Sequence, residues 1–278
     1  MRLFVDKLTH IDFSFLHPAR GLVGETWQAS VVLHGDLDDQ GMVVDFGDVK
    51  KRIKRWLDEE VDHRLLIPEQ SPCLSLKSDA QGYDFSWHYA NHSIHSTCPT
   101  QAITLIDGTV ITTDSVARWC MEKLLPEFPA SVKKIELVFT PEHIEGPYYH
   151  YSHGLKKHRG NCQRIAHGHR SRIFIWRDGK LSNTDMETWA QRWQDIYIGT
   201  QEDRTTAQNP DNEGFRYRSE QGAFYLEVPQ RQCYMIDTDS TIEFIAQHIA
   251  QTLKREHPES DFVVKAFEGI EKGAIAES

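Results

Sequence analysis

The two halves of the chain repeat one order of secondary structure, and this repetition limits the folds that the chain can adopt. Each half reads as two strands, a helix, a hairpin-like insertion, a second helix and one or two strands. This order predicts an α+β fold in which each half is an antiparallel sheet with two helices on one face. The insertions, residues 68–107 and 209–229, are long for connections in a compact domain, which makes them candidate partner surfaces or walls of a pocket.

Histidines gather at the start of the second copy. His167 and His169 are two residues apart, and His153 precedes them. Alternate side chains of an extended segment share a face, so His167 and His169 can approach one metal ion, with His153 arriving from the neighbouring strand. Three nitrogen ligands with a fourth position open are typical of catalytic zinc. Cys162 is a candidate reactive thiol beside the metal.

Two other interpretations of these histidines stay open. The chain contains 15 histidines, so a His-x-His pair can also arise without any metal. If a metal is bound but His153 is not a ligand, His150 and His158 are the alternatives.

Composition and charge exclude several classes of function. The 278 residues are 39% hydrophobic and 26% charged, as in globular proteins of one large or two ordinary domains. No run approaches the roughly 20 apolar residues of a membrane span and the start lacks a signal peptide, so we expect no membrane partner and a cytoplasmic location. Five scattered cysteines predict no disulfide framework. The net charge of -10 argues against nucleic acid.

The charge is nevertheless uneven. Lys156, Arg164, Arg170 and other basic residues surround the histidines. A positive pocket in an acidic protein indicates an anionic small-molecule substrate. For residues 156–159, a solvated basic loop is the alternative.

The first half carries a different candidate site. Apolar residues at three- and four-residue steps predict a helix from residue 46 to residue 61, with Asp45 as its N-cap. Asp62 and His63 follow this helix directly. Taken alone, such a pair indicates only a solvent-facing helix end.

Both candidate sites resemble one family. His153, Cys162 and His167-Gly168-His169 are similar to the zinc-and-cysteine signature of the 6-pyruvoyl-tetrahydropterin synthase and 6-carboxytetrahydropterin synthase family. The run from Gly41 to Lys50 resembles the Gly-Met-Val-x-Asp-Phe segment that opens the first helix of that family. Asp62-His63 resembles its proton-transfer pair.

The resemblance implies two tandem T-folds (tunnelling folds), residues 1–142 and 143–278, whose sheets close into a barrel when the chain forms a homo-oligomer. Aligned by sequence, the first copy has Gly24-Glu25-Thr26 where the second has His167-Gly168-His169. We therefore expect no metal in the first half, which supplies the Asp-His pair, and zinc and pterin in the second.

The resemblance also implies the chemistry, a zinc-dependent lyase reaction on 7,8-dihydroneopterin triphosphate. Zn²⁺ would be bound by His153, His167 and His169; Cys162 would be the base, and Asp62 with His63 would relay the proton. Glu268 would anchor the pterin ring, with Glu142 as the weaker candidate. Basic residues would take the triphosphate; the candidates are Lys156, Arg164 and Arg170.

Two products and two other functions stay open. The product would be 6-carboxytetrahydropterin, a precursor of queuosine and other 7-deazapurines, or 6-pyruvoyl-tetrahydropterin. The other functions are a zinc hydrolase or lyase acting on a different small anion and a non-catalytic pterin-binding scaffold.

Overall fold

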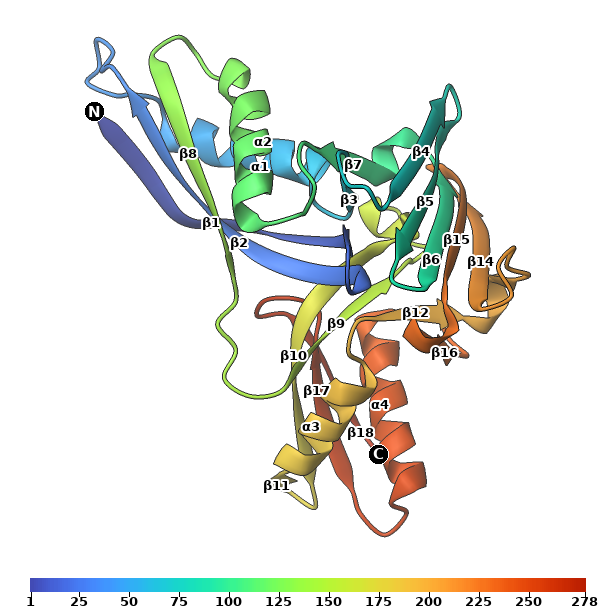
Figure 1. Ribbon diagram of the computed structural model, residues 1–278. Helices are drawn as coiled ribbons and strands as arrows, with labels where there is room; N and C mark the ends of the chain where they lie inside the picture. Colours follow the sequence, from blue (N-terminus) through green and yellow to red (C-terminus); the bar gives the residue numbers. More distant parts are fainter.

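The computed structural model describes every residue from 1 to 278 as three β-sheets and four α-helices (Figure 1). The first half, in blue and green, and the second half, in yellow and red, each form one helix-covered sheet, and the third sheet lies beside both. None of the helices is long and apolar enough to span a bilayer.

The first half builds a five-stranded sheet in the order β7-β3-β1-β2-β8. Its helices are α1 (Phe46–Glu60) and α2 (Thr113–Leu124). Its strands are β1 (Arg2–His17), β2 (Gly21–Gly35), β3 (Leu65–Pro68), β7 (Ile103–Ile106) and β8 (Val132–Pro141).

The second half repeats this plan in the order β16-β12-β9-β10-β17-β18, with the short β11 beside β10. Its helices are α3 (Asn183–Arg192) and α4 (Ile242–Glu256). Its strands are β9 (Tyr148–His153), β10 (His167–Arg177), β11 (Lys180–Leu181), β12 (Ile196–Thr200), β16 (Cys233–Ile236), β17 (Phe262–Phe267) and β18 (Gly273–Glu277).

The expectation of purely antiparallel sheets was wrong at one edge of each half. β3 runs parallel to β1 and β7 parallel to β3, and in the second half β12 and β16 are parallel additions beside β9. The reason is the connection. A helix carries the chain back along the sheet before β3 and before β12, and an insertion carries it back before β7 and before β16, so that each of these strands can run parallel to its neighbour.

The expectation of two helices on one face of each sheet is confirmed. α1 buries Val49, Ile53 and Leu57 in the same apolar core as α2 and the first sheet. The side chain of Asp45 caps α1 by accepting hydrogen bonds from the backbone N–H groups of Gly47 and Asp48. α3 and α4 share the corresponding core of the second sheet.

The two insertions pair with each other in the third sheet. The first contributes β4 (Leu74–Asp79), β5 (Gly82–Tyr89) and β6 (His92–Cys98). The second contributes β14 (Asn212–Ser219) and β15 (Gly222–Pro229), preceded by β13 (Arg204–Thr205). β15 pairs with β6, so that one six-stranded sheet ties the halves together (Figure 1).

The β1–β2 and β9–β10 hairpins cross in close contact at the centre of the molecule (Figure 1). The hydroxyl oxygens of Ser14 and Ser152 lie 2.7 Å apart and are buried. A Cβ atom on Gly168 would lie 2.7 Å from the Cα of Gly24. Ser14 pairs with Gly24 in one hairpin and Ser152 with Gly168 in the other, so the halves meet about an approximate two-fold axis.

Candidate active site

The three histidines predicted to bind metal meet at the start of β10. His167 pairs directly with His153 on β9, and His169 lies two residues further along the same face. All three side chains are buried, and their ligand nitrogens lie within 4.8 Å of one another. The Nε2 atoms of His153 and His169 are 3.2 Å apart.

Each of these imidazoles is held through its other nitrogen. Nδ1 of His153 lies 3.0 Å from the backbone oxygen of Ser240, and Nδ1 of His167 lies 3.0 Å from that of Arg164. Nδ1 of His169 lies 3.2 Å from a carboxylate oxygen of Asp12, an ion-pair contact that does not have hydrogen-bond geometry. A partner at Nδ1 fixes the tautomer and directs Nε2 toward a common point, as second-shell groups do around metals.

The arrangement fits a metal ion of the zinc type. Two nitrogens bound to tetrahedral zinc at 2.0–2.1 Å are about 3.3 Å apart, close to the spacing of His153 and His169. Nε2 of His167 is buried without any hydrogen-bond partner, a deficiency that a metal bond would remove. Burial lowers the pKa values of His153 and His167 well below the usual range, which keeps both rings neutral, as metal ligation requires.

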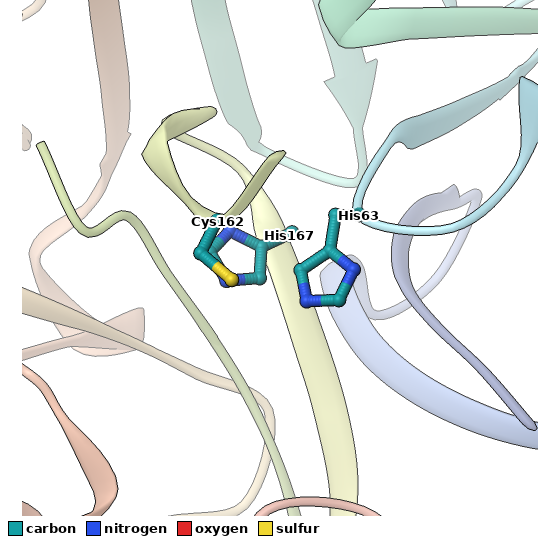
Figure 2. A group of neighbouring side chains, drawn as sticks. All are labelled: His63, Cys162 and His167. Atoms are coloured by element: carbon teal, nitrogen blue, oxygen red, sulfur yellow. The ribbon is translucent and has the colours of Figure 1, made fainter. Parts of the chain in front are cut away.

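His63, Cys162 and His167 form a second group that adjoins the first. Their ligand atoms lie within 4.8 Å of one another, and Figure 2 shows the three side chains directed toward one another. Cys162 lies on a 3-10 turn (Asn161–Gln163), whereas His63 follows α1. The Asp-His pair of the first half, predicted to transfer protons, therefore meets the thiol of the second half within one chain.

The Asp62–His63 pair is oriented as a proton relay requires. Nδ1 of His63 lies 2.5 Å from Oδ2 of Asp62. Burial alone would lower the pKa of His63, but hydrogen bonds to Asp62 and Cys162 outweigh it and raise that pKa well above its usual value. His63 has a φ of 54°, a left-handed conformation rare for residues other than glycine, which turns its side chain inward at the helix end.

Asp12 of β1 joins both groups, and the sequence analysis did not single it out. Its backbone N–H donates to Oδ1 of Asp62 at 2.7 Å, and its backbone oxygen accepts from the N–H of His63 at 2.6 Å. Its buried carboxylate lies beside His169 and accepts from the hydroxyl of Thr26. A charged residue amid apolar neighbours, between Ile11 and Phe13, was the available sequence signal.

The C-terminal hairpin brings a carboxylate and an amine to the histidines. Glu268 lies with Oε1 3.8 Å from Nε2 of His169. The Nζ of Lys272 lies 3.0 Å from Asp12 and 3.9 Å from Glu268. Lys272, which the sequence analysis missed, is thus a cation beside the histidines. Glu142 instead pairs with Arg172 at 2.8 Å.

The three basic residues predicted to bind phosphate have other partners. Lys156 forms ion pairs with Asp203 at 2.5 Å and with Glu202 at 3.1 Å. Arg170 follows His169 on β10 and therefore points to the opposite face of the sheet. Its guanidinium stacks on Tyr148 and donates to the backbone oxygen of Glu142.

Arg164 is buried, and its guanidinium bonds to Gln221 and to the backbone oxygens of Asp62 and His63. Lys156, Arg170 and Arg164 therefore each contact other parts of the protein, and their binding of phosphate stays a prediction.

The two-fold axis defines an equivalent position in the first half, which has none of the three histidines. The strand pairing matches Val23-Gly24-Glu25 with His167-Gly168-His169, one residue away from the sequence-based alignment, because Gly24 and Gly168 meet at the axis. Phe15 matches His153. Phenyl and isopropyl groups cannot bind metal, so of the three residues matched to the histidines only Glu25 could act as a ligand.

An ion pair stands at this equivalent position in place of the thiol–imidazole contact. Asp195 has a φ of 57°, like His63, and follows α3 as His63 follows α1. Its carboxylate accepts two hydrogen bonds from Arg20, at 2.8 and 2.5 Å. Beside it opens a hollow of about 630 Å³, lined in part by Arg20, His150 and Gln194.

The family model of 6-pyruvoyl tetrahydropterin synthase matches residues 8–145 and again residues 146–277. The chain belongs to this family. The two consecutive matches confirm the tandem arrangement of α+β T-fold units. One relative is a putative 6-carboxy-5,6,7,8-tetrahydropterin synthase of Pyrococcus horikoshii. It is 22% identical over 132 residues, which make up 48% of this chain and 76% of that protein.

Solved structures of the family are similar to one half of the chain. The 6-pyruvoyltetrahydropterin synthase of Plasmodium vivax has 18% identity and a TM-score of 0.42, over 52% of this chain and 93% of that one. The Plasmodium falciparum enzyme has 16% identity and a TM-score of 0.41, over 51% and 91%.

Proposed function

We propose that the chain is a zinc-dependent lyase that converts 7,8-dihydroneopterin triphosphate to 6-carboxy-5,6,7,8-tetrahydropterin, on the route to queuosine and other 7-deazapurines. One observation carries the proposal. The three clustered histidines, the thiol of Cys162 and the Asp62–His63 pair converge in a single chain, although they come from different halves. A pterin-binding scaffold would have no need of a thiol beside an imidazole pair and open metal ligands.

Zinc would be held by His153, His167 and His169, the nitrogens of which meet the requirements described above. When bound, zinc supplies a Lewis acid for the side-chain hydroxyls of the substrate. Asp12 keeps His169 oriented, and the backbone oxygens of Ser240 and Arg164 keep the other two imidazoles oriented.

Cys162 and His63 would move the protons. The imidazolium of His63 gives the thiolate of Cys162 a counter-charge, and the thiolate can take a proton from the substrate carbon next to the ring. His63 can exchange the proton with the substrate or with water, because Asp62 stabilises its protonated form.

Glu268 is the proposed anchor of the pterin ring. A carboxylate matches the 2-amino and N3–H donors of a pterin at two points. Glu268 lies near the histidines and is partly exposed, whereas Glu142 is already paired with Arg172. Lys272, half exposed beside Glu268, is the cation best placed to attract the negative charge of the substrate.

Incubation with 7,8-dihydroneopterin triphosphate, followed by mass detection, tests this function. We expect a carboxypterin together with acetaldehyde. A pyruvoylpterin would instead establish the alternative, the reaction named for the Plasmodium enzymes. Bound but unchanged pterin would favour a scaffold, and no binding at all would favour another anionic substrate. The role of Glu268 is tested by a second experiment. Glu268→Ala should lose affinity for the pterin, and the matched control Glu142→Ala should retain it.

Metal analysis tests the cofactor separately. We expect one zinc ion per chain, and a loss of zinc in His167→Ala. Two zinc ions per chain, or unchanged zinc in His167→Ala, would contradict the assignment. His158→Ala is the matched control, because this residue lies on the exposed part of the loop before Cys162.

We also propose that the chain forms a homo-oligomer in which the sheets close into a barrel. β8 and β18 are outer strands of their sheets, and each carries an exposed apolar side chain, Val138 at 55% and Ile275 at 64%. Unpaired edges of this kind are usually covered. Light scattering of the purified protein should give a multiple of the chain mass; a monomer would refute this.

A further inference from the structure

The hairpin tip between β14 and β15 contacts the turn that carries Cys162. This tip belongs to the insertion of the second half, in the third sheet. The turn is a single 3-10 turn with no regular strand or helix around Cys162, so its position depends on contacts from elsewhere. Gln221 at the tip supplies three hydrogen bonds to this segment, and Tyr217 and the backbone oxygen of Asp58 supply one each.

The side chain of Gln221 bonds to residues on both sides of Cys162. Its Oε1 accepts from Nε of Arg164 at 3.0 Å, and its Nε2 donates to Oδ1 of Asn161 at 2.9 Å. Its backbone N–H also donates, to Oε1 of Gln163 at 2.8 Å. Three of the residues around the thiol are therefore tied to one glutamine.

Gln221 is itself held by the first insertion, since Nε2 of Gln101 donates to its backbone oxygen at 3.0 Å. On the opposite side, Nη1 of Arg164 lies 3.4 Å from the backbone oxygens of both Asp62 and His63. Gln221 is thus linked by hydrogen bonds, through the side chain of Arg164, to the backbone of Asp62 and His63.

We propose that Gln221 is a positioning residue, which sets the distance between the thiol of Cys162 and the imidazole of His63. This role rests on the proposed function, in which these two groups transfer protons. Gln221 forms no hydrogen bond to the three clustered histidines or to Glu268, and it holds the side chain of Arg164 and not the backbone oxygen that faces His167. Its loss should therefore slow the chemical step and leave substrate binding nearly unchanged.

The variant Gln221→Met keeps the length of the side chain and removes both of its polar contacts. We expect kcat to fall about 10–100-fold, the effect of misplacing a reacting group by roughly 1 Å. KM should stay within about twofold, and zinc content should be unchanged. Gln221→Glu keeps an acceptor for Arg164 and should recover part of kcat; recovery no better than in Gln221→Met would overturn the role of the Arg164 contact.

Amide hydrogen exchange supplies a readout that does not depend on turnover. The N–H of Leu155 donates to the backbone oxygen of Cys162 at 2.8 Å, and the N–H of Arg164 donates within the turn at 3.0 Å. Both should exchange about tenfold faster in Gln221→Met, because the turn loses its external support. Gln101→Ala, which removes only the donor to the Gln221 backbone, should have a smaller effect in the same direction.

Gln230→Met is the matched control, since Gln230 is an exposed glutamine just past the other end of β15. It should match the wild type in kcat and exchange. Unchanged kcat or unchanged exchange in a folded Gln221→Met would overturn the proposal. If the wild type does not act on the pterin triphosphate, the proposed function fails, and faster exchange confined to the turn would still support the positioning contact.

Discussion

Replacement of Asp12 by asparagine should weaken zinc binding, although Asp12 is not itself a proposed ligand. The carboxylate lies 3.2 Å from Nδ1 of His169 and 3.0 Å from Nζ of Lys272. Burial would raise the pKa of Asp12, but His169, Lys272 and Thr26 outweigh it and hold this pKa below its usual value, so the carboxylate is charged. Asparagine keeps an oxygen for Thr26 and removes the charge.

The expected loss follows from the role of an orienting partner. Removing one such group around a metal typically costs 10–100-fold in affinity, or about 1.4–2.7 kcal/mol. The pair with Lys272 adds little, because the lysine side chain is 52% exposed. Competition against a chromophoric chelator measures the zinc affinity directly. Asp6→Asn, an exposed aspartate on the same strand, is the matched control.

Two outcomes would refute this reasoning. One is a zinc affinity of Asp12→Asn within twofold of the wild type. The other is an equal loss in Lys272→Met, which would assign the effect to the charge pair with the lysine and not to the orientation of His169. Both outcomes count only if Asp12→Asn and Lys272→Met are folded, which thermal unfolding of the two variants checks.

Three further predictions concern the two halves. Cys162→Ala and His63→Ala should each abolish turnover with zinc retained, and the two variants unfolded and reassembled together should stay inactive, because both residues lie in one chain; recovered activity would show that the site forms between chains. Arg20→Met should lower the free energy of unfolding by about 1–3 kcal/mol, since Asp195 is left buried without its partner, and denaturant unfolding measures this; unchanged stability would contradict it.

The third of these predictions uses the equivalent position of the first half. Burial raises the pKa of Glu25 to about 7, so this residue contributes stability at low pH that is lost as pH rises from about 4.5 through 7. Glu25→Gln should therefore be more stable than the wild type by about 3 kcal/mol at pH 8 and similar to it near pH 4, as measured by unfolding at both values. An equal difference at both would refute the assignment.

The sequence predicted features that are encoded locally. The spacing of His167 and His169 on one strand requires only that the strand forms, and the helix after Asp45 follows from its apolar period. The third sheet had no such signal, because β6 and β15 pair across the two halves. Asp12 was missed for the same reason, since its partner His169 lies in the other half.

The basic residues show why composition predicts a site poorly. Lys156 and Arg164 lie near the histidines in sequence, as the charge pattern indicated, yet each has its own partner in the fold. Lys272, the cation that does lie beside the histidines, belongs to a segment that is neither basic nor close to them in sequence. A net positive charge along a stretch of chain does not tell which side chains the fold brings beside the histidines.

The asymmetry of the halves follows from the way the hairpins cross. Gly24 and Gly168 let the two hairpins touch. This contact places the hairpin of each half beside the end of a helix of the other half. Two equivalent positions result. At one, His63 meets Cys162; at the other, Asp195 meets Arg20.

The contact between the halves has a different task at each position. At the first, the proposed function requires that metal ligands and a thiol stay unsatisfied, which costs stability. At the second, a bidentate ion pair can hold the halves together without that requirement. Because the two units of this chain differ in sequence, one position can stabilise the contact between the halves while the other carries the reactive groups of the proposed function. Identical units would carry the same residues at both positions.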